Sequence, residues 1–124
     1  MKKYICLLVL ITIILCGCTT MKTDNSGIKK INCDEKNKLM EKTNTYLIDV
    51  REEYEYNENH LQRAINMPVT NIANTIKNNK DITIDSNIIV YCKSGKRSSS
   101  TVDILKKLGY KNIYDLGSIS NCKK

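Results

Sequence analysis

Apolar residues are concentrated in a few runs along the chain, and the spacing within each run predicts an element of structure. Residues 46–50 and 88–91 are short, β-favouring apolar runs, interrupted only by Asp49. Continuous runs of this length are typical of strands that are buried on both faces of a sheet. Residues 112–116 predict a further short strand. Strands of this kind need helices above and below them.

Three helices are predicted before the second apolar run. Asn32 followed by Glu35 resembles a capping box, and this pattern predicts a helix over residues 33–41. Shorter helices are expected near residues 52–57 and 70–77.

The last forty residues alternate between strand and helix patterns. After Cys92, the apolar residues Val102, Leu105 and Leu108 recur at helical spacing, and Gly109 is placed to cap that helix at its C-terminus. A strand follows. This alternation predicts an α/β domain with a mainly parallel central sheet, flanked by helices on both faces.

The N-terminal apolar run has the layout of a secretory signal. Two lysines precede an apolar run over residues 4–15, and small residues and cysteine follow. Leu15-Cys16-Gly17-Cys18 resembles a bacterial lipobox, which implies cleavage before Cys18 and attachment of diacylglycerol to its sulfur. Cys16 is the rival acceptor, but Leu15 would then stand where a small residue is usual.

A retained transmembrane helix is the alternative for this segment. Residues 4–21 contain no charged side chain, but this length is the lower limit for crossing a bilayer. Polar and small residues then predict a flexible tether. We expect a lipoprotein signal peptide (1–17), a lipidated Cys18 with its tether (18–30) and one folded domain (31–124), anchored outside the cytoplasm on a bacterial membrane.

Length and charge restrict the choice of function. The chain has 124 residues, which is enough for one ordinary domain. Its 20 basic and 13 acidic residues give a formal net charge of +7. The basic residues form no block and do not alternate with aromatic residues, so we expect no nucleic-acid partner.

The segment with candidate chemistry begins at Cys92, where a predicted strand ends and a helix is about to begin. Cations, a glycine and a hydroxyl follow at once, as Lys93, Ser94, Gly95, Lys96 and Arg97. Backbone N–H groups of such a loop, the positive end of the helix and the cations all favour a thiolate over a thiol. The sequence therefore predicts a nucleophile that attracts an anionic substrate, rather than a buried cysteine that merely ends a strand.

The length of this loop separates two reactions. Cysteine phosphatases place five residues between the cysteine and an arginine, whereas Cys92 and Arg97 enclose four, and Ser98 stands at the next position. A tighter loop fits the oxygens of phosphate poorly. The spacing favours attack on a sulfane sulfur, which leaves a persulfide.

Two longer blocks surround these residues. YLIDVREEYEYNENHLQRAINMP begins at Tyr46, and IIVYCKSGKRSSSTVDILKKLGYKNIYDLG begins at Ile88. In this order and spacing, the chain resembles a single-domain rhodanese, of the sulfurtransferase family, from about residue 31 to residue 119. The resemblance implies that Cys92 accepts sulfur and that residues 93–97 hold the anionic donor and then the persulfide.

The resemblance also implies the substrates. The donor would be thiosulfate or a similar small anion, the acceptor would be cyanide or a thiol, and neither a cofactor nor a metal is expected. The alternative is a membrane-tethered module that carries sulfur or binds a protein without turning over thiosulfate.

Five other residues need an interpretation. Asp49 and Arg51 end another strand, where they either support the loop or form a fold-holding ion pair, which we favour. His60, the only histidine, is expected to be structural. For Cys122 we favour an inert thiol over a disulfide with Cys33 and over a resolving role. The family usually has an aromatic residue at Cys122, so we expect reduced packing at the sheet edge and lower stability.

Overall fold

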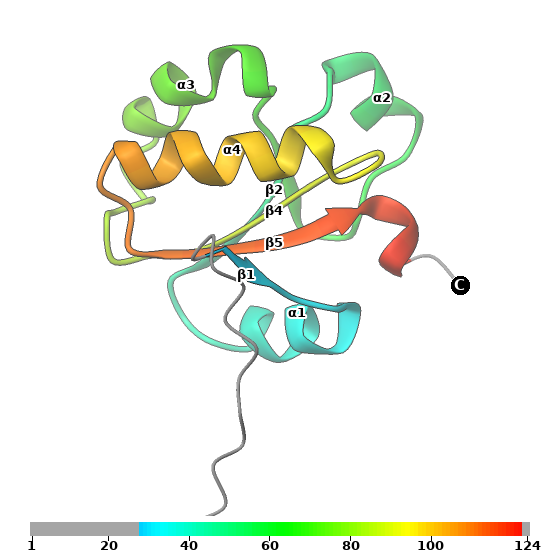
Figure 1. The fold of residues 1–124 in the computed structure, drawn as a ribbon, viewed down its shortest axis with the longest axis horizontal. Helices are drawn as coiled ribbons and strands as arrows, with labels where there is room; N and C mark the ends of the chain where they lie inside the picture. Colours follow the sequence, from blue (N-terminus) through cyan, green and yellow to red (C-terminus); the bar gives the residue numbers. More distant parts are fainter. Residues whose placement is uncertain (1–27, 123–124) are drawn as a thin grey trace, which may run out of the picture.

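Five strands lie side by side in one sheet in the computed structural model, which describes residues 28–122 (Figure 1). Their order is β1-β5-β4-β2-β3, and every neighbouring pair is parallel. The strands are β1 (Lys29–Lys30), β2 (Thr45–Asp49), β3 (Ala64–Asn66), β4 (Asn87–Cys92) and β5 (Asn112–Ser118). Since β4 is central, the cysteine that ends it lies in the middle of the carboxyl edge.

Helices cover both faces of this sheet. Helices α3 (Ile72–Asn78) and α4 (Lys96–Lys107) lie on one face, and α1 (Cys33–Met40) lies on the other (Figure 1). Helix α2 (Glu53–Glu58) follows β2, and two 3₁₀ helices complete the fold, η1 (Val69–Asn71) and η2 (Ile119–Cys122). The predicted α/β class, with helices on both faces, is confirmed.

Alternate residues of β4 are buried on opposite faces of the sheet. Ile88, Val90 and Cys92 belong to the core cluster beneath α3 and α4, whereas Ile89 and Tyr91 belong to the cluster beneath α1. Successive side chains of a strand point to opposite faces. Because Cys92 has the same parity as Val90, its sulfur lies on the face that α4 covers.

The predicted helix ends have the expected chemistry. Asn32 accepts a hydrogen bond from the backbone N–H of Glu35 at 2.9 Å, and the Glu35 carboxylate accepts one from the N–H of Asn32 at 2.8 Å. This reciprocal pair confirms the capping box. Gly109, which follows the last residues of α4, has a φ of +95°, as the predicted C-terminal cap requires.

The folded part begins earlier than expected. Lys29 and Lys30 pair with Tyr114 and Asp115 of β5, so the predicted tether over residues 18–30 is wrong for its last residues. Two lysines have no apolar pattern, so the sequence does not show that this strand pairs with β5 through its backbone. Strand β3 was also not predicted, because three residues are too few to show a period.

The interpretations of the N-terminal run concern residues outside the described part. The signal peptide and the lipidation of Cys18 lie before residue 28 and stay predictions. Among the helices of residues 28–122, none has the length and apolar character needed to cross a membrane.

Cys33 and Cys122 form a disulfide, so the prediction of an inert thiol at Cys122 is wrong. Their Cα atoms are 5.2 Å apart, although 89 positions separate them in sequence. The reason is the position of β5: Cys33 follows β1, which pairs with β5, and Cys122 lies in η2, which follows β5. The pairing of these strands brings the two ends of the described domain together.

Candidate active site

The loop after β4 turns sharply before α4 begins. Residues 93–95 connect the strand to Lys96, the first residue of the helix. Gly95 has a φ of +93°, a conformation that side chains with a Cβ rarely adopt. A Cβ at this position would also lie 3.6 Å from the Cα of Gly117 in β5. Glycine therefore permits the left-handed turn and a close approach to the neighbouring strand.

The sulfur of Cys92 lies inside this turn and accepts two backbone hydrogen bonds. The N–H of Gly95 donates to Sγ at 3.0 Å, and the N–H of Ser98 donates at 3.3 Å. Cys92 has no exposed surface and is the free cysteine of the described part. Two N–H donors at a helix N-terminus stabilise negative charge on sulfur, as a nucleophile requires.

The three cations of the loop have different surroundings. The Arg97 guanidinium donates two hydrogen bonds to the Glu55 carboxylate of α2, from Nη1 at 2.6 Å and from Nη2 at 3.0 Å. This hydrogen bonding lowers the pKa of Glu55 from 4.5 to about 2 and raises the pKa of Arg97. Lys93 and Lys96 are exposed, and neither takes part in an ion pair within residues 28–122. Their charges are therefore available to an anion, whereas that of Arg97 is paired.

Asp49 and Arg51 form a buried ion pair at the end of β2. Arg51 Nη2 lies 2.7 Å from Asp49 Oδ2, and its Nε donates to both carboxylate oxygens. The same Nη2 donates to the carbonyl of Asn59, and the guanidinium lies 5.8 Å from the centre of the Tyr91 ring. The hydrogen bond to Asp49 raises the pKa of Arg51. These contacts join β2 to the segment after α2, as expected for a pair that holds the fold.

His60 contacts α2. Its ring stacks on that of Tyr56, with centroids 3.8 Å apart, and its Nδ1 lies 2.9 Å from the Tyr56 carbonyl. These contacts agree with the structural role expected for it. In the described part of the chain, the side chains of His, Cys, Asp and Glu form no group of three that could hold a metal ion.

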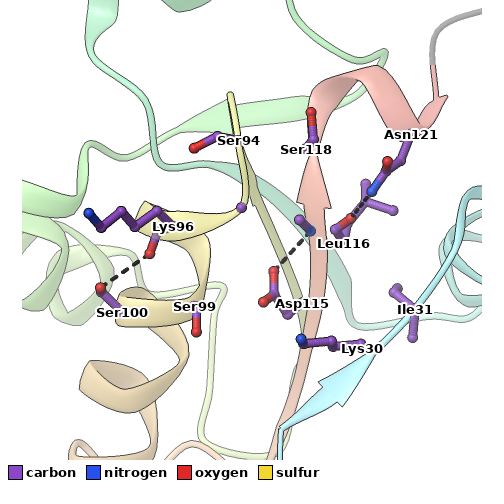
Figure 2. Close-up of a pocket in the computed structure, with 12 residues that line it drawn as sticks. Lys30, Ile31, Ser94, Lys96, Ser99, Ser100, Asp115, Leu116, Ser118 and Asn121 are labelled. Atoms are coloured by element: carbon purple, nitrogen blue, oxygen red, sulfur yellow. Dashed lines mark hydrogen bonds between the residues drawn. The ribbon is translucent and has the colours of Figure 1, made fainter.

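A pocket of about 660 Å³ lies beside the loop, between the start of α4 and the edge formed by β5 and β1 (Figure 2). Ser94, Gly95 and Lys96 form one wall, and the segment from Asp115 to Ser118 forms the opposite wall. Ser118 Oγ donates to the Lys93 carbonyl at 2.5 Å, so the end of β5 contacts the loop directly.

The family model described as "Rhodanese-like domain" matches residues 32–124. The chain belongs to the rhodanese family. This match covers most of the chain and includes Cys92, the loop, and both strands that lie next to β4.

Relatives of this chain include two kinds of protein. A mitochondrial protein of Schizosaccharomyces pombe, provisionally named a thiosulfate sulfurtransferase, is 39% identical over 79 residues, which are 56% of this chain and 56% of that protein. A tRNA uridine(34) hydroxylase of Prochlorococcus marinus is 34% identical over 101 residues, which are 76% of this chain and 32% of the hydroxylase. The chain therefore spans only about half and about a third of the length of these two relatives.

Solved structures agree with the assignment. A human single-domain sulfurtransferase superposes with a TM-score of 0.64 at 19% identity, over 72% of this chain and 88% of that protein. At this identity the likeness shows a shared fold.

Sequence reasoning located the loop of this rhodanese but missed two of its supports. Glu55 and Ser118 lie 37 positions before and 26 positions after Cys92, and both contact the loop. Glu55 belongs to an acidic-aromatic stretch with several glutamates, and nothing in that stretch shows which of them faces Arg97. Ser118 is the last residue of β5, and its hydroxyl contacts the loop because β5 lies beside β4.

Proposed function

We propose that this chain is a sulfurtransferase that forms a persulfide on Cys92. The observation that supports it best is the sulfur itself, which accepts N–H groups from Gly95 and Ser98 and lies beneath a loop with two unpaired cations. The similarity to the Schizosaccharomyces pombe protein, which shares 39% of its residues over the matched region, supports the same reaction.

The reaction proceeds in two displacements. The Cys92 thiolate attacks the outer sulfur of thiosulfate or a similar anionic donor, so that a bond forms between the two sulfurs. The bond between the outer sulfur and the sulfonate sulfur breaks, and sulfite leaves with its electron pair. Cyanide or a thiolate then attacks the outer sulfur of the persulfide, and the Cys92 thiolate is released.

The loop contributes to both displacements. The ammonium groups of Lys93 and Lys96 attract the donor and offset the charge of the departing sulfite. The N–H groups of Gly95 and Ser98 stabilise the thiolate that is consumed in the first step and restored in the second. The guanidinium of Arg97 is already paired with Glu55, so Arg97 supports the shape of the loop rather than the binding of the donor.

We also propose that the domain works outside the cytoplasm, anchored to a bacterial membrane through lipid on Cys18. The Cys33–Cys122 disulfide supports an oxidising location, because structural disulfides are rare in reducing compartments. The lipobox-like segment before Cys18 supports the anchor.

Two other functions predict different behaviour. A sulfur carrier would form the persulfide but pass it only to a protein acceptor. We do not propose hydroxylation of tRNA, because the similarity covers only 32% of the Prochlorococcus marinus hydroxylase.

The decisive experiment uses the full chain in mild detergent, beside Cys92→Ser. After incubation with thiosulfate, mass spectrometry of the peptide that contains residue 92 should show one added sulfur in the parent and none in Cys92→Ser. Addition of cyanide should release thiocyanate from the parent alone. A persulfide without thiocyanate would favour the carrier, and folded parent protein that gains no sulfur would refute sulfur transfer from thiosulfate.

A further inference from the structure

The C-terminal segment meets the loop at two points. The hydroxyl of Ser118 donates to the Lys93 carbonyl at 2.5 Å, and the Gly117 backbone lies against Gly95. Figure 2 shows Ser118 at the end of β5, next to the strand end and loop that lead to Ser94. We call residues 117–122 the C-terminal clamp.

The direction of the Ser118 hydrogen is fixed by its neighbours. Ser118 has one hydrogen, which it donates to the Lys93 carbonyl. The hydroxyl of Ser120, 2.7 Å away, must then donate to Ser118, and the N–H of Ser120 donates to the same oxygen at 3.2 Å. Ser118 is thereby held with its hydrogen toward the loop.

A bond to the Lys93 carbonyl orients the peptide that follows it. The peptide group is planar and trans, so the carbonyl of Lys93 and the N–H of Ser94 point in opposite directions. When Ser118 holds the carbonyl, the Ser94 N–H is fixed on the side away from β5. The N–H of Gly95, the next in the chain, is the one that donates to Cys92 Sγ. The orientation of this peptide therefore affects how the loop presents N–H groups to the sulfur.

The clamp is itself attached at its far end. Asn121 donates to the Leu116 carbonyl at 2.8 Å, and Ile119 is buried in the cluster beneath α1. The Cys33–Cys122 disulfide then joins η2 covalently to α1. Three residues lie between Ser118 and Cys122, so the disulfide restricts the path of the segment that holds the loop.

We propose that Ser118 is a positioning residue for the loop and that the Cys33–Cys122 disulfide holds it in place, so that reduction of this bond weakens the reactivity of Cys92. The effect of this inference on catalysis rests on the proposed function. The geometry around Ser118 is independent of that function. A dithiol reductant is required for the switch. Its first thiolate attacks one sulfur of the disulfide and its second releases the mixed disulfide, which leaves two protein thiols and a cyclic disulfide after transfer of two electrons and two protons.

The test measures Cys92 directly. In the full chain, the rate of alkylation by iodoacetamide is read on the peptide that contains residue 92, a measurement that needs no sulfur donor. Ser118→Ala should lower this rate about fivefold, since a typical hydrogen bond contributes about that factor. Ser118→Thr retains the hydroxyl and should restore most of the rate. The matched control is Thr75→Ala in α3, which removes a hydroxyl that donates to the Asn71 carbonyl, and it should have no effect.

Kinetics with thiosulfate provide a second readout. Ser118→Ala should lower kcat while KM changes little, because the ammonium groups of Lys93 and Lys96 that attract the donor remain. Thermal unfolding of each variant shows that the assays are made on folded protein. An alkylation rate in folded Ser118→Ala that is normal or higher than that of the parent, or a loss that Ser118→Thr does not restore, would overturn the positioning role. If the parent protein takes up no sulfur, only the proposed function is refuted, because the alkylation rate still tests the positioning role of Ser118.

The disulfide is tested by a double-mutant cycle. Cys33→Ser/Cys122→Ser should lower the alkylation rate in the same direction as Ser118→Ala. The combined variant should lose less than the product of the two effects, since both act through one contact. Effects that multiply, or a double serine variant with the parent's alkylation rate, would show that the disulfide does not act through Ser118 and would refute the redox step.

Discussion

Replacement of Glu55 by glutamine removes the negative charge from the partly buried ion pair with Arg97 of the loop and nearly preserves the shape of the side chain. Glu55 also accepts the N–H of Glu52 in the capping box of α2, at 3.0 Å. Glutamine serves that role as well as glutamate does. The variant therefore removes the charge of Glu55 and one of its two hydrogen bonds from Arg97, while the capping box remains.

The expected magnitude follows from the pKa and the exposure of the pair. A fall in the pKa of Glu55 from 4.5 to about 2 corresponds to at most about 3 kcal/mol. A third of the Arg97 side chain is exposed, so solvent screening reduces the expected contribution to about 1–2 kcal/mol. Because the folded pKa lies below the unfolded one, this contribution is complete above about pH 4.5 and is lost as the pH falls toward about 2.

The assay is urea unfolding of the full chain and of Glu55→Gln across this pH range. Far-ultraviolet circular dichroism is the appropriate probe, because the chain contains no tryptophan. The difference in free energy of unfolding should be about 1–2 kcal/mol at neutral pH and should approach zero near pH 2. Glu53→Gln, an exposed neighbour in α2, should show no such difference. A difference that stays constant with pH, or is absent at neutral pH, would refute the argument from charge.

Three further predictions concern stability and location. Asp49→Ala leaves the buried Arg51 guanidinium without its partner and should lower the free energy of unfolding by about 3–5 kcal/mol. Asp85→Ala breaks the exposed pair with Lys111 and should lower it by less than about 1 kcal/mol. Urea unfolding compares the two variants, and equal losses would contradict the role of burial. Removal of the disulfide in Cys33→Ser/Cys122→Ser should lower the same quantity by about 4–5 kcal/mol, since the closed loop is long; an unchanged urea midpoint would contradict it. Cys18→Ala should abolish incorporation of a labelled fatty acid in bacterial cells whereas Cys16→Ala should not, and the reverse result would place the lipid on Cys16.

The sequence predicts the elements with a clear period and the chemistry that is local to one segment. β2 and β4 are nearly continuous buried runs, and α4 buries residues three or four positions apart, so their positions follow from the pattern of apolar residues. Cys92 and residues 93–97 are contiguous in sequence. The turn at Gly95, between strand and helix, places backbone N–H groups around the sulfur. Strand β1 has no such pattern, because both of its residues are lysine and it pairs with Tyr114 and Asp115 of β5 through the backbone.

Contacts between distant segments could not be predicted in this way. Arg97 is expected to be a free cation when only the loop is considered, and only the position of α2 shows that Glu55 neutralises it. Cys33 and Cys122 have no recognisable spacing, since their meeting depends on the pairing of β1 with β5. The pairing of β4 with β5, in which Cys92 lies opposite Ser118, brings Ser118 to Lys93. The loop itself is thus specified by adjacent residues, whereas the supports that fix its shape come from α2 and β5, so substitutions far from Cys92 in sequence are the ones expected to tune its reactivity.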